Sequence, residues 1–193
     1  MEGPDLATKV KYLRAQLRRR EFAAAHEAAC ALRAHHPGNR DVLCILAGSL
    51  RGLDRIPEAL EVLKDLEHQH PAYGRLFEER GHCHLSRQAI DAAISDFAKA
   101  VTLNPWLPES LRTLEHLYRM RGRVKEAEAT ARFSAKLEKL PREIIAAHGM
   151  FVDGEIDSAD KLVREYLKSH GDHIEGMRLL ARIAMARDMP HDA

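Results

Sequence analysis

The sequence predicts an all-α protein built as a line of stacked helical hairpins, and two series of regularly spaced residues carry this prediction. Alanine recurs in one register, with steps of 34 residues except for one step of 32, at Ala25, Ala59, Ala93, Ala127, Ala159 and Ala193. Proline follows three of these alanines twelve residues later, at Pro37, Pro71 and Pro105. Periods of this size are typical of stacked repeats, in which each hairpin buries its apolar face against its neighbours.

The first repeat consists of a basic helix and an alanine-rich helix. The first helix is expected over about residues 6–19, where four apolar residues at helical spacing share one face. The second is expected over about residues 22–36 and ends at Pro37, because proline cannot continue a helix. The apolar residues of the first helix are Leu6, Val10, Leu13 and Leu17.

The next two repeats follow the same plan, with an apolar helix, a short turn and a second apolar helix. Pro57 stands near the start of a second helix, where its missing N–H leaves no hydrogen bond unmade. The segment from Gly81 to Pro105 is the clearest copy of the repeat. Its marker residues are Gly81, Ala93, Phe97, Ala100 and Pro105.

The last part of the chain adds two further repeats and one helix without a second half. Turns are expected at Gly122 and Gly154, and a shorter connection near residues 139–141 explains the step of 32 residues. We place the repeats within a single array over residues 1–193. Their approximate limits are 6–39, 40–73, 74–107, 108–139 and 140–173, with a half-repeat over 174–193.

Composition and charge exclude several classes of protein. The chain of 193 residues has 30 Lys plus Arg against 29 Asp plus Glu, and this balance argues against a nucleic-acid binder that neutralises phosphates. The three cysteines form no close pair, which favours buried thiols in a reducing compartment and a cytoplasmic protein. No run approaches the roughly 20 apolar residues of a membrane span, so no membrane association is expected.

The first helix is markedly basic. This pattern fits an acidic partner or a membrane surface, or else a solvated terminal face, which we favour from the sequence. The basic residues are Lys9, Lys11, Arg14, Arg18, Arg19 and Arg20.

The repeat resembles the tetratricopeptide repeat (TPR), and we expect the protein to be bacterial. In that family a small residue, an aromatic residue and an alanine precede a terminal proline. Gly81, Phe97, Ala100 and Pro105 match this signature, whereas Glu115 departs from it at a position that normally holds a small residue. The resemblance implies a right-handed superhelix whose first helices line a concave groove that binds a peptide or a partner protein. It implies no catalytic activity and no cofactor.

The resemblance also assigns ligand-facing positions in that groove. Three histidines in one register, with arginine at the same register near each end of the array, favour an acidic peptide or an anionic ligand. Binding to protonated histidine would weaken as pH rises through the histidine range near 6.5. The predicted ligand-facing residues are Arg14, Glu78, His82, Arg112, His116, Arg119, His148, Arg178 and Arg182.

Other interpretations of these residues compete with a role in ligand binding. The chain contains 12 histidines, so three in one register also arise from repeat ancestry alone. A metal site is disfavoured, because packed helices lie about 8 to 10 Å apart and zinc ligands about 2.1 Å from one ion. The lysine and asparagine clamp of TPR arrays that bind C-terminal EEVD-type peptides is absent, and no sequence motif indicates an enzyme.

The unfinished last repeat leaves two outcomes open. Either the chain is the N-terminal part of a longer protein, or a second copy covers the exposed helix and forms a homodimer. The C-terminal segment also resembles the TPR regions that precede sulfotransferase domains in some bacterial proteins. The alternative function is therefore a docking or regulatory region of a larger enzyme.

Overall fold

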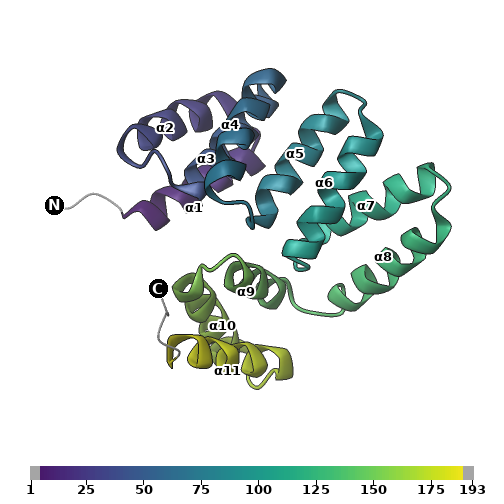
Figure 1. Cartoon of the computed structure of the whole chain (residues 1–193). Helices are drawn as coiled ribbons and strands as arrows, with labels where there is room; N and C mark the ends of the chain where they lie inside the picture. Colours follow the sequence, from purple (N-terminus) through teal and green to yellow (C-terminus); the bar gives the residue numbers. More distant parts are fainter. Residues whose placement is uncertain (1–4, 189–193) are drawn as a thin grey trace. The chain divides into compact units, whose positions relative to one another are not determined.

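The computed structural model describes residues 5–188, and this part of the chain forms eleven α-helices and no strand (Figure 1). The helices are α1 (Leu6–Arg18), α2 (Phe22–His35), α3 (Arg40–Gly52), α4 (Ile56–Gln69), α5 (Gly74–Ser86), α6 (Ile90–Leu103), α7 (Pro108–Met120), α8 (Val124–Leu137), α9 (Arg142–Val152), α10 (Ile156–His170) and α11 (Ile174–Asp188). The predicted fold class, an all-α solenoid of helical hairpins with α11 as the half-repeat, is confirmed.

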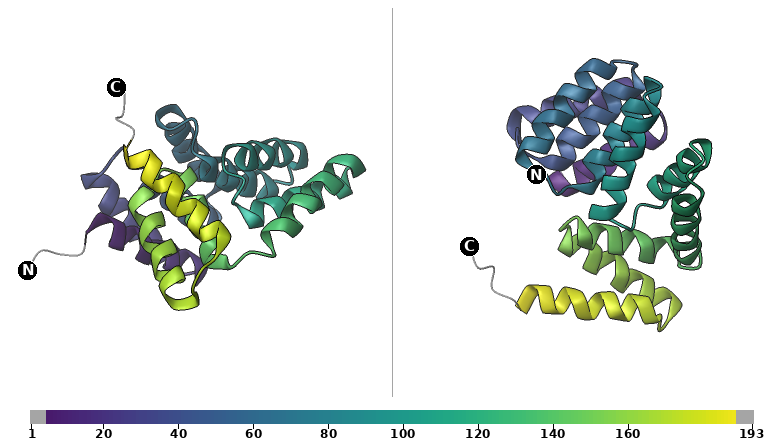
Figure 2. Two further views of the ribbon diagram at one scale, coloured as in Figure 1. Left: turned by 90° about the horizontal axis from the view of Figure 1, so that it is seen from below. Right: turned by 45° about the vertical axis from the view of Figure 1, so that its right-hand side comes forward.

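The described residues pack as two compact units, which divide between Leu103 and Asn104. In the first unit the hairpins α1–α2, α3–α4 and α5–α6 stack, with α3 packed against α1, α2, α4 and α5. In the second unit α7 pairs with α8, while α9, α10 and α11 pack side by side (Figure 2). A single array over residues 1–193 stays a prediction.

The alanine register marks the close contacts between helices. Ala25, Ala59, Ala93 and Ala159 are fully buried, and Ala127 is 2% exposed. The sixth member, Ala193, lies outside the described residues. Small side chains at these positions let neighbouring helices approach closely. The alanine spacing therefore predicted real helix contacts in both units.

Gly81 shows how tight the contact inside one hairpin is. A Cβ atom on residue 81 would come within 2.9 Å of Cε2 of Phe97, so the glycine of α5 makes room for the aromatic ring of α6. Phe97, Ala93 and Ala100 are fully buried. Gly81 and Phe97 thus form a close contact between α5 and α6.

Every hairpin turn contains one residue in the left-handed conformation. The φ angles are 63° at Arg20, 61° at Asp54, 58° at Gln88, 67° at Gly122 and 76° at Gly154. These positions are separated by 34, 34, 34 and 32 residues, so the turn geometry follows the alanine register. Only the last two use glycine, which adopts this conformation without steric cost.

The second unit is joined internally by a buried asparagine. The side-chain amide of Asn104 donates to the carbonyl of Gly149 at 3.1 Å and to Oδ1 of Asp153 at 2.9 Å. Its side-chain oxygen accepts from the backbone N–H of Trp106 at 3.0 Å. Asn104 is fully buried, so these bonds fix the segment before α7 against the end of α9.

Candidate functional site

The predicted ligand-facing residues of the first unit have partners inside the fold. Arg14 of α1 donates from Nη2 to Oδ1 of Asp41 at 2.7 Å, and the hydroxyl of Tyr73 donates to the same oxygen at 2.8 Å. On α5, His82 is half-buried and meets the ring of Phe97 edge-on, with 5.0 Å between ring centroids. Glu78 is also half-buried. Arg14, Glu78 and His82 therefore present only part of each side chain to solvent.

The predicted residues of α7 form an exposed cationic face. Residues 112, 116 and 119 are spaced by four and three, so they lie along one side of the helix. Arg112, His116 and Arg119 are all exposed or partly exposed. Arg112 pairs with Glu109 at 2.8 Å, and Arg119 pairs with Glu115 at 2.8 Å. Exposed pairs of this kind contribute little to stability, so both guanidinium groups remain available to a stronger acceptor.

His148 contradicts the expectation that it is an exposed groove residue. Its side chain is 2% exposed and its ring stacks on Trp106, with 3.9 Å between ring centroids and an interplanar angle of 8°. Neither ring nitrogen has a hydrogen-bond partner among the described residues. Burial lowers the pKa of His148, the positive charge of Arg182 lowers it further, and Glu175 opposes both. The register placed His148 on the expected helix, but Trp106, which covers it, comes from a loop 42 residues earlier.

The two predicted arginines of α11 lie one turn apart, and both present their side chains to solvent at least in part. Arg178 pairs with Glu175 at 2.5 Å, and the guanidinium of Arg182 lies over the ring of Phe151, 4.7 Å from its centroid. Arg182 is close enough to His148 to affect its protonation. In this unit the fold thus brings Arg182 and His148 together, although only the arginine faces solvent.

Two further residues of the first helices were missed by sequence reasoning. Arg51 of α3 hydrogen-bonds to Glu79 of α5, which joins successive first helices in the same way as Arg14 and Asp41 do. Within each pair the two residues are just under one repeat apart in the sequence: 28 positions for Arg51 and Glu79, and 27 for Arg14 and Asp41. This spacing of opposite charges is a signal that could have identified both pairs. Since each carboxylate is satisfied inside the fold, these pairs are structural.

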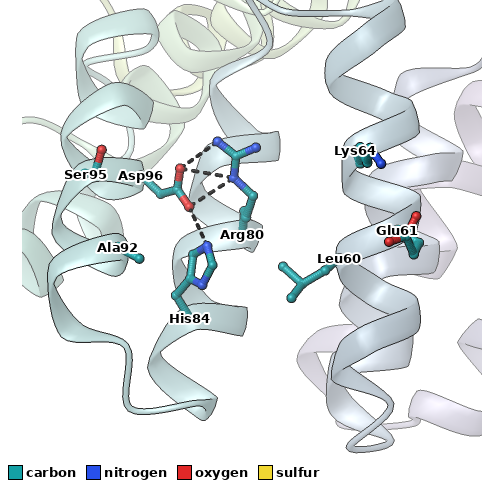
Figure 3. A pocket seen from close by; sticks show the side chains of 8 residues that line it. All are labelled: Leu60, Glu61, Lys64, Arg80, His84, Ala92, Ser95 and Asp96. Atoms are coloured by element: carbon teal, nitrogen blue, oxygen red, sulfur yellow. Dashed lines mark hydrogen bonds and ion pairs between the residues drawn. The ribbon is translucent and has the colours of Figure 1, made fainter.

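A polar pocket of about 390 Å³ opens between α4 on one side and α5 and α6 on the other (Figure 3). Its lining residues are Leu60, Glu61, Lys64, Arg80, His84, Ala92, Ser95 and Asp96. Arg80 stands two residues from both Glu78 and His82, which places it about 160° around α5 from each of them at 100° per residue. The pocket is therefore separate from the predicted ligand-facing side of α5.

Arg80 is the centre of the polar network in this pocket. Its Nη2 donates to Oδ1 of Asp96 at 2.8 Å and its Nε donates to Oδ2 at 3.0 Å, while Nη1 pairs with Glu67. Nε2 of His84 lies 3.4 Å from Oδ2 of Asp96. Although burial raises the pKa of Glu67, hydrogen bonds from Arg80 and Lys99 lower it overall. The network ties α4, α5 and α6 together, and each of its charged groups has a partner of opposite sign.

The described residues 5–188 include no group of three or more His, Cys, Asp or Glu side chains arranged to hold a metal ion. Within the same range, no helix is both long enough and apolar enough to cross a membrane. All three cysteines are free thiols, with Cys30 exposed, Cys44 half-buried and Cys83 buried.

Comparison with known proteins identifies the fold. No family model matches the chain, and no curated protein is similar to it in sequence. Among solved structures, the TPR protein TTC0263 of Thermus thermophilus is 20% identical, with a TM-score of 0.59, and the match covers 95% of this chain and 99% of that one. PilF of Pseudomonas aeruginosa is 14% identical over 94% of this chain and 84% of its own, with a TM-score of 0.60.

A larger assembly contains a similar segment. A chain in the structure of Naa15/Naa10 bound to HypK-THB is 16% identical, with a TM-score of 0.64. The match covers 94% of this chain but only 29% of that one. At these identities the similarity establishes a shared fold, that of the tetratricopeptide repeat.

Proposed function

We propose that this protein is an interaction scaffold that binds an acidic peptide or protein segment, and that binding and not catalysis is its role. The fold supports the proposal because each hairpin uses its apolar residues for stacking and leaves polar side chains of the first helices exposed. The carrying observation is the face of α7, where Arg112, His116 and Arg119 lie along one solvent-facing side of a helix.

The acidic character of the ligand follows from the hydrogen-bonding groups on this face. Guanidinium groups bind carboxylates through paired N–H donors, and imidazole adds a further donor. The competing pairs with Glu109 and Glu115 are intrahelical, and a third pair joins Arg112 to Glu138, just after α8, at 3.5 Å. All three are close to solvent, so a partner carboxylate with better geometry displaces them. On α11, Arg178 and Arg182 extend the same chemistry within the second unit.

Affinity capture followed by mass spectrometry tests this function. The full chain and a variant with Arg112→Ala, His116→Gln and Arg119→Ala are compared as baits. Loss of the same captured proteins from the variant is expected. A matched control, Arg132→Ala with Arg164→Ala, removes two arginines that also pair within their own helices, on α8 and α10. Equal capture by all three proteins would reject the α7 face.

A second proposal concerns α11 and a second copy of this chain. Ala47 and Ala147 are fully buried by their partner helices, whereas Ala181, in the same register, is exposed together with Met177. Met185 is exposed on the same side of α11, eight residues after Met177. This exposed apolar side supports a homodimer through the uncovered face of α11.

The alternative of a docking region within a larger sulfotransferase stays a prediction from sequence resemblance. The genomic sequence beyond the codon for Ala193 tests it directly, because a downstream domain with a phosphosulfate-binding loop would support it. The three free thiols support the cytoplasmic location expected from the sequence.

A further inference from the structure

The segment from residue 6 to residue 20 contains six basic residues and no acidic one. In the structure one of the six, Arg14, is joined to Asp41 of α3. The other five form no ion pair with any described residue, and all five are exposed. They are Lys9, Lys11, Arg18, Arg19 and Arg20.

Several exposed arginines elsewhere in the described residues are paired within their own segment of the chain. Arg55, Arg119 and Arg164 each pair with a carboxylate three or four residues away in the sequence. Such pairs are the ordinary way to keep an exposed helix face soluble with mixed charge. A face with one sign of charge instead creates a local potential that attracts the opposite sign.

Helix stability does not account for the charges on α1. Cations are favourable near the last turn of a helix, which explains Arg18, but unfavourable near the first turn. Lys9 and Lys11 lie in the first half of α1, and its first turn contains no acidic residue. Because the effect of the helix dipole is confined to the first and last turns, it does not account for these two lysines.

The equivalent residues of the next repeat show what kind of partner fits this side of α1. One repeat later, the counterparts of Thr8, Lys11, Tyr12 and Ala15 are Val42, Ile45, Leu46 and Ser49, which are all buried. That side of α3 meets the preceding hairpin, since Ser49 lies 3.4 Å from His26 of α2. The same side of α1 is largely open to solvent, and Tyr12 is 59% exposed. This side of α1 is therefore equivalent to a helix-stacking face, but Lys11 replaces the apolar Ile45.

We propose that this basic face, formed by Thr8, Lys11, Tyr12, Ala15 and Arg18 of α1 and by Arg19 at its C-cap, docks an acidic amphipathic helix of a partner protein. Thr8 and Ala15 are small and let a helix approach closely. Lys11 and Arg18 lie seven residues, about 10 Å, apart along the helix and match carboxylates at the same spacing. Tyr12 supplies the apolar contact area.

Two other occupants fit less well. A membrane surface is disfavoured because Val10 and Leu13, the apolar side of α1, are buried against the protein and cannot enter a bilayer. The C-terminal helix of a second copy is disfavoured because its Arg178 and Arg182 have the same sign of charge. An acidic helix meets both the charge and the shape of the basic face.

Fluorescence anisotropy tests the proposal with the full chain. The probe is a fluorescein-labelled amphipathic peptide of roughly fourteen residues with Glu at positions seven apart, matching two heptads. We expect binding that weakens as salt is added. It should also weaken at least about tenfold in a variant with Lys11→Glu, Arg18→Glu and Arg19→Glu. Three substitutions are combined because each exposed pair contributes little alone. A second peptide with Lys in place of Glu should bind this variant and not the natural chain.

Matched controls separate this surface from general charge effects. A variant with Lys136→Glu, Lys161→Glu and Lys168→Glu changes the net charge equally at exposed lysines of α8 and α10, and should bind the peptide like the natural chain. Equal weakening in both variants, or equal binding of a scrambled peptide of the same composition, would overturn the proposal. So would binding to phosphatidylserine vesicles with no binding to the peptide. The α7 variant described above should retain this binding, so the two proposals fail independently.

Discussion

Cys30 differs from the other two cysteines in its access to solvent. It is exposed on α2, and its Sγ lies 3.7 Å from Nε2 of His26. Burial raises the pKa of Cys83 to about 12, with the negative charge of Glu79 adding to the effect, and burial likewise raises the pKa of Cys44. Since the thiolate is the reactive form, the two enclosed thiols are protected at neutral pH.

We therefore expect iodoacetamide to label Cys30 alone in the native protein at neutral pH. Mass spectrometry of the intact protein should show one added group, and Cys30→Ser should abolish the labelling. Cys83→Ser serves as the control and should label like the natural chain. Comparable labelling rates at Cys44 and Cys30 before unfolding would contradict this expectation.

The stacked pair of Trp106 and His148 links protonation to stability. The pKa of His148 is lowered in the folded state, so between that value and the ordinary value of about 6.5 the unfolded chain binds more protons than the folded one. The free energy of unfolding should therefore fall as pH falls from about 6.5 through the lowered pKa. Above about 6.5 this group has no effect on the pH dependence of stability.

Trp106 is the only tryptophan in the chain, so its fluorescence reports this site directly. Protonation of a stacked imidazole should quench the indole, and the quenching should appear only at acidic pH. His148→Phe keeps an aromatic ring on Trp106 but cannot be protonated. This variant should lose both the fluorescence titration and the acid-dependent part of the destabilisation measured by urea unfolding. An unchanged pH profile in His148→Phe would assign the effect to another group.

At the scale of the helical hairpin, the turns offer a matched pair of substitutions. Gln88 has a φ of 58° and Gly122 a φ of 67°, in the same register of two hairpins. A Cβ atom on residue 122 would have no neighbour within 4 Å, so any effect there comes from backbone conformation alone. Gly122→Ala should lower the free energy of unfolding by about 1 to 2 kcal/mol, as measured by urea unfolding.

The reverse change should stabilise the protein. Gln88→Gly removes the cost of the left-handed conformation, about 1 to 2 kcal/mol, and adds backbone entropy to the unfolded chain, which offsets part of the gain. A net increase of about 0.5 kcal/mol in the free energy of unfolding is expected from chemical denaturation. If both substitutions changed stability in the same direction, backbone conformation would not control these turns.

Much of the fold at this scale follows from the sequence. The alanine register identified residues that are buried in both units, and the limits of α1 and α2 match the expected ranges to within about one residue. The environment of a given register position could not be predicted from the repeat. Arg14, His82, His116 and His148 occupy equivalent positions, yet only His148 is fully enclosed. The difference lies in neighbours such as Trp106, which come from loops and do not obey the repeat.

The division into two units was also outside what the repeat could predict. It falls between Leu103 and Asn104, inside the best copy of the repeat, where the alanine series continues unbroken from Ala93 to Ala127. Asn104 makes its buried hydrogen bonds to Gly149 of α9 and to Asp153 just after it, within the second unit. The Asn104 side chain thus links the segment after α6 to α9, and the repeat period does not predict such a contact.

For the whole molecule, the uncovered face of α11 predicts self-association. Ile174, Met177 and Met185 are exposed large apolar residues on this helix. Sedimentation equilibrium at high micromolar concentration should show a dimer, and Met177→Glu should weaken the association at least about tenfold by placing a charge in an apolar contact. Met120→Glu is the control, because Met120 is also exposed, on α7. A monomer under these conditions would rule out the dimer.

The charges on α1 set a limit on how copies of this chain can join. Joining of unlike helices, α1 of one copy to α11 of the next, is a head-to-tail contact, and such contacts can repeat without closing into fibres. Here α1 and α11 both present arginine to solvent, so that joining brings like charges together. Contact between two copies of α11 is self-complementary and stops at a pair. If two copies join through α11 as proposed, the like charges of α1 and α11 would oppose further growth into fibres.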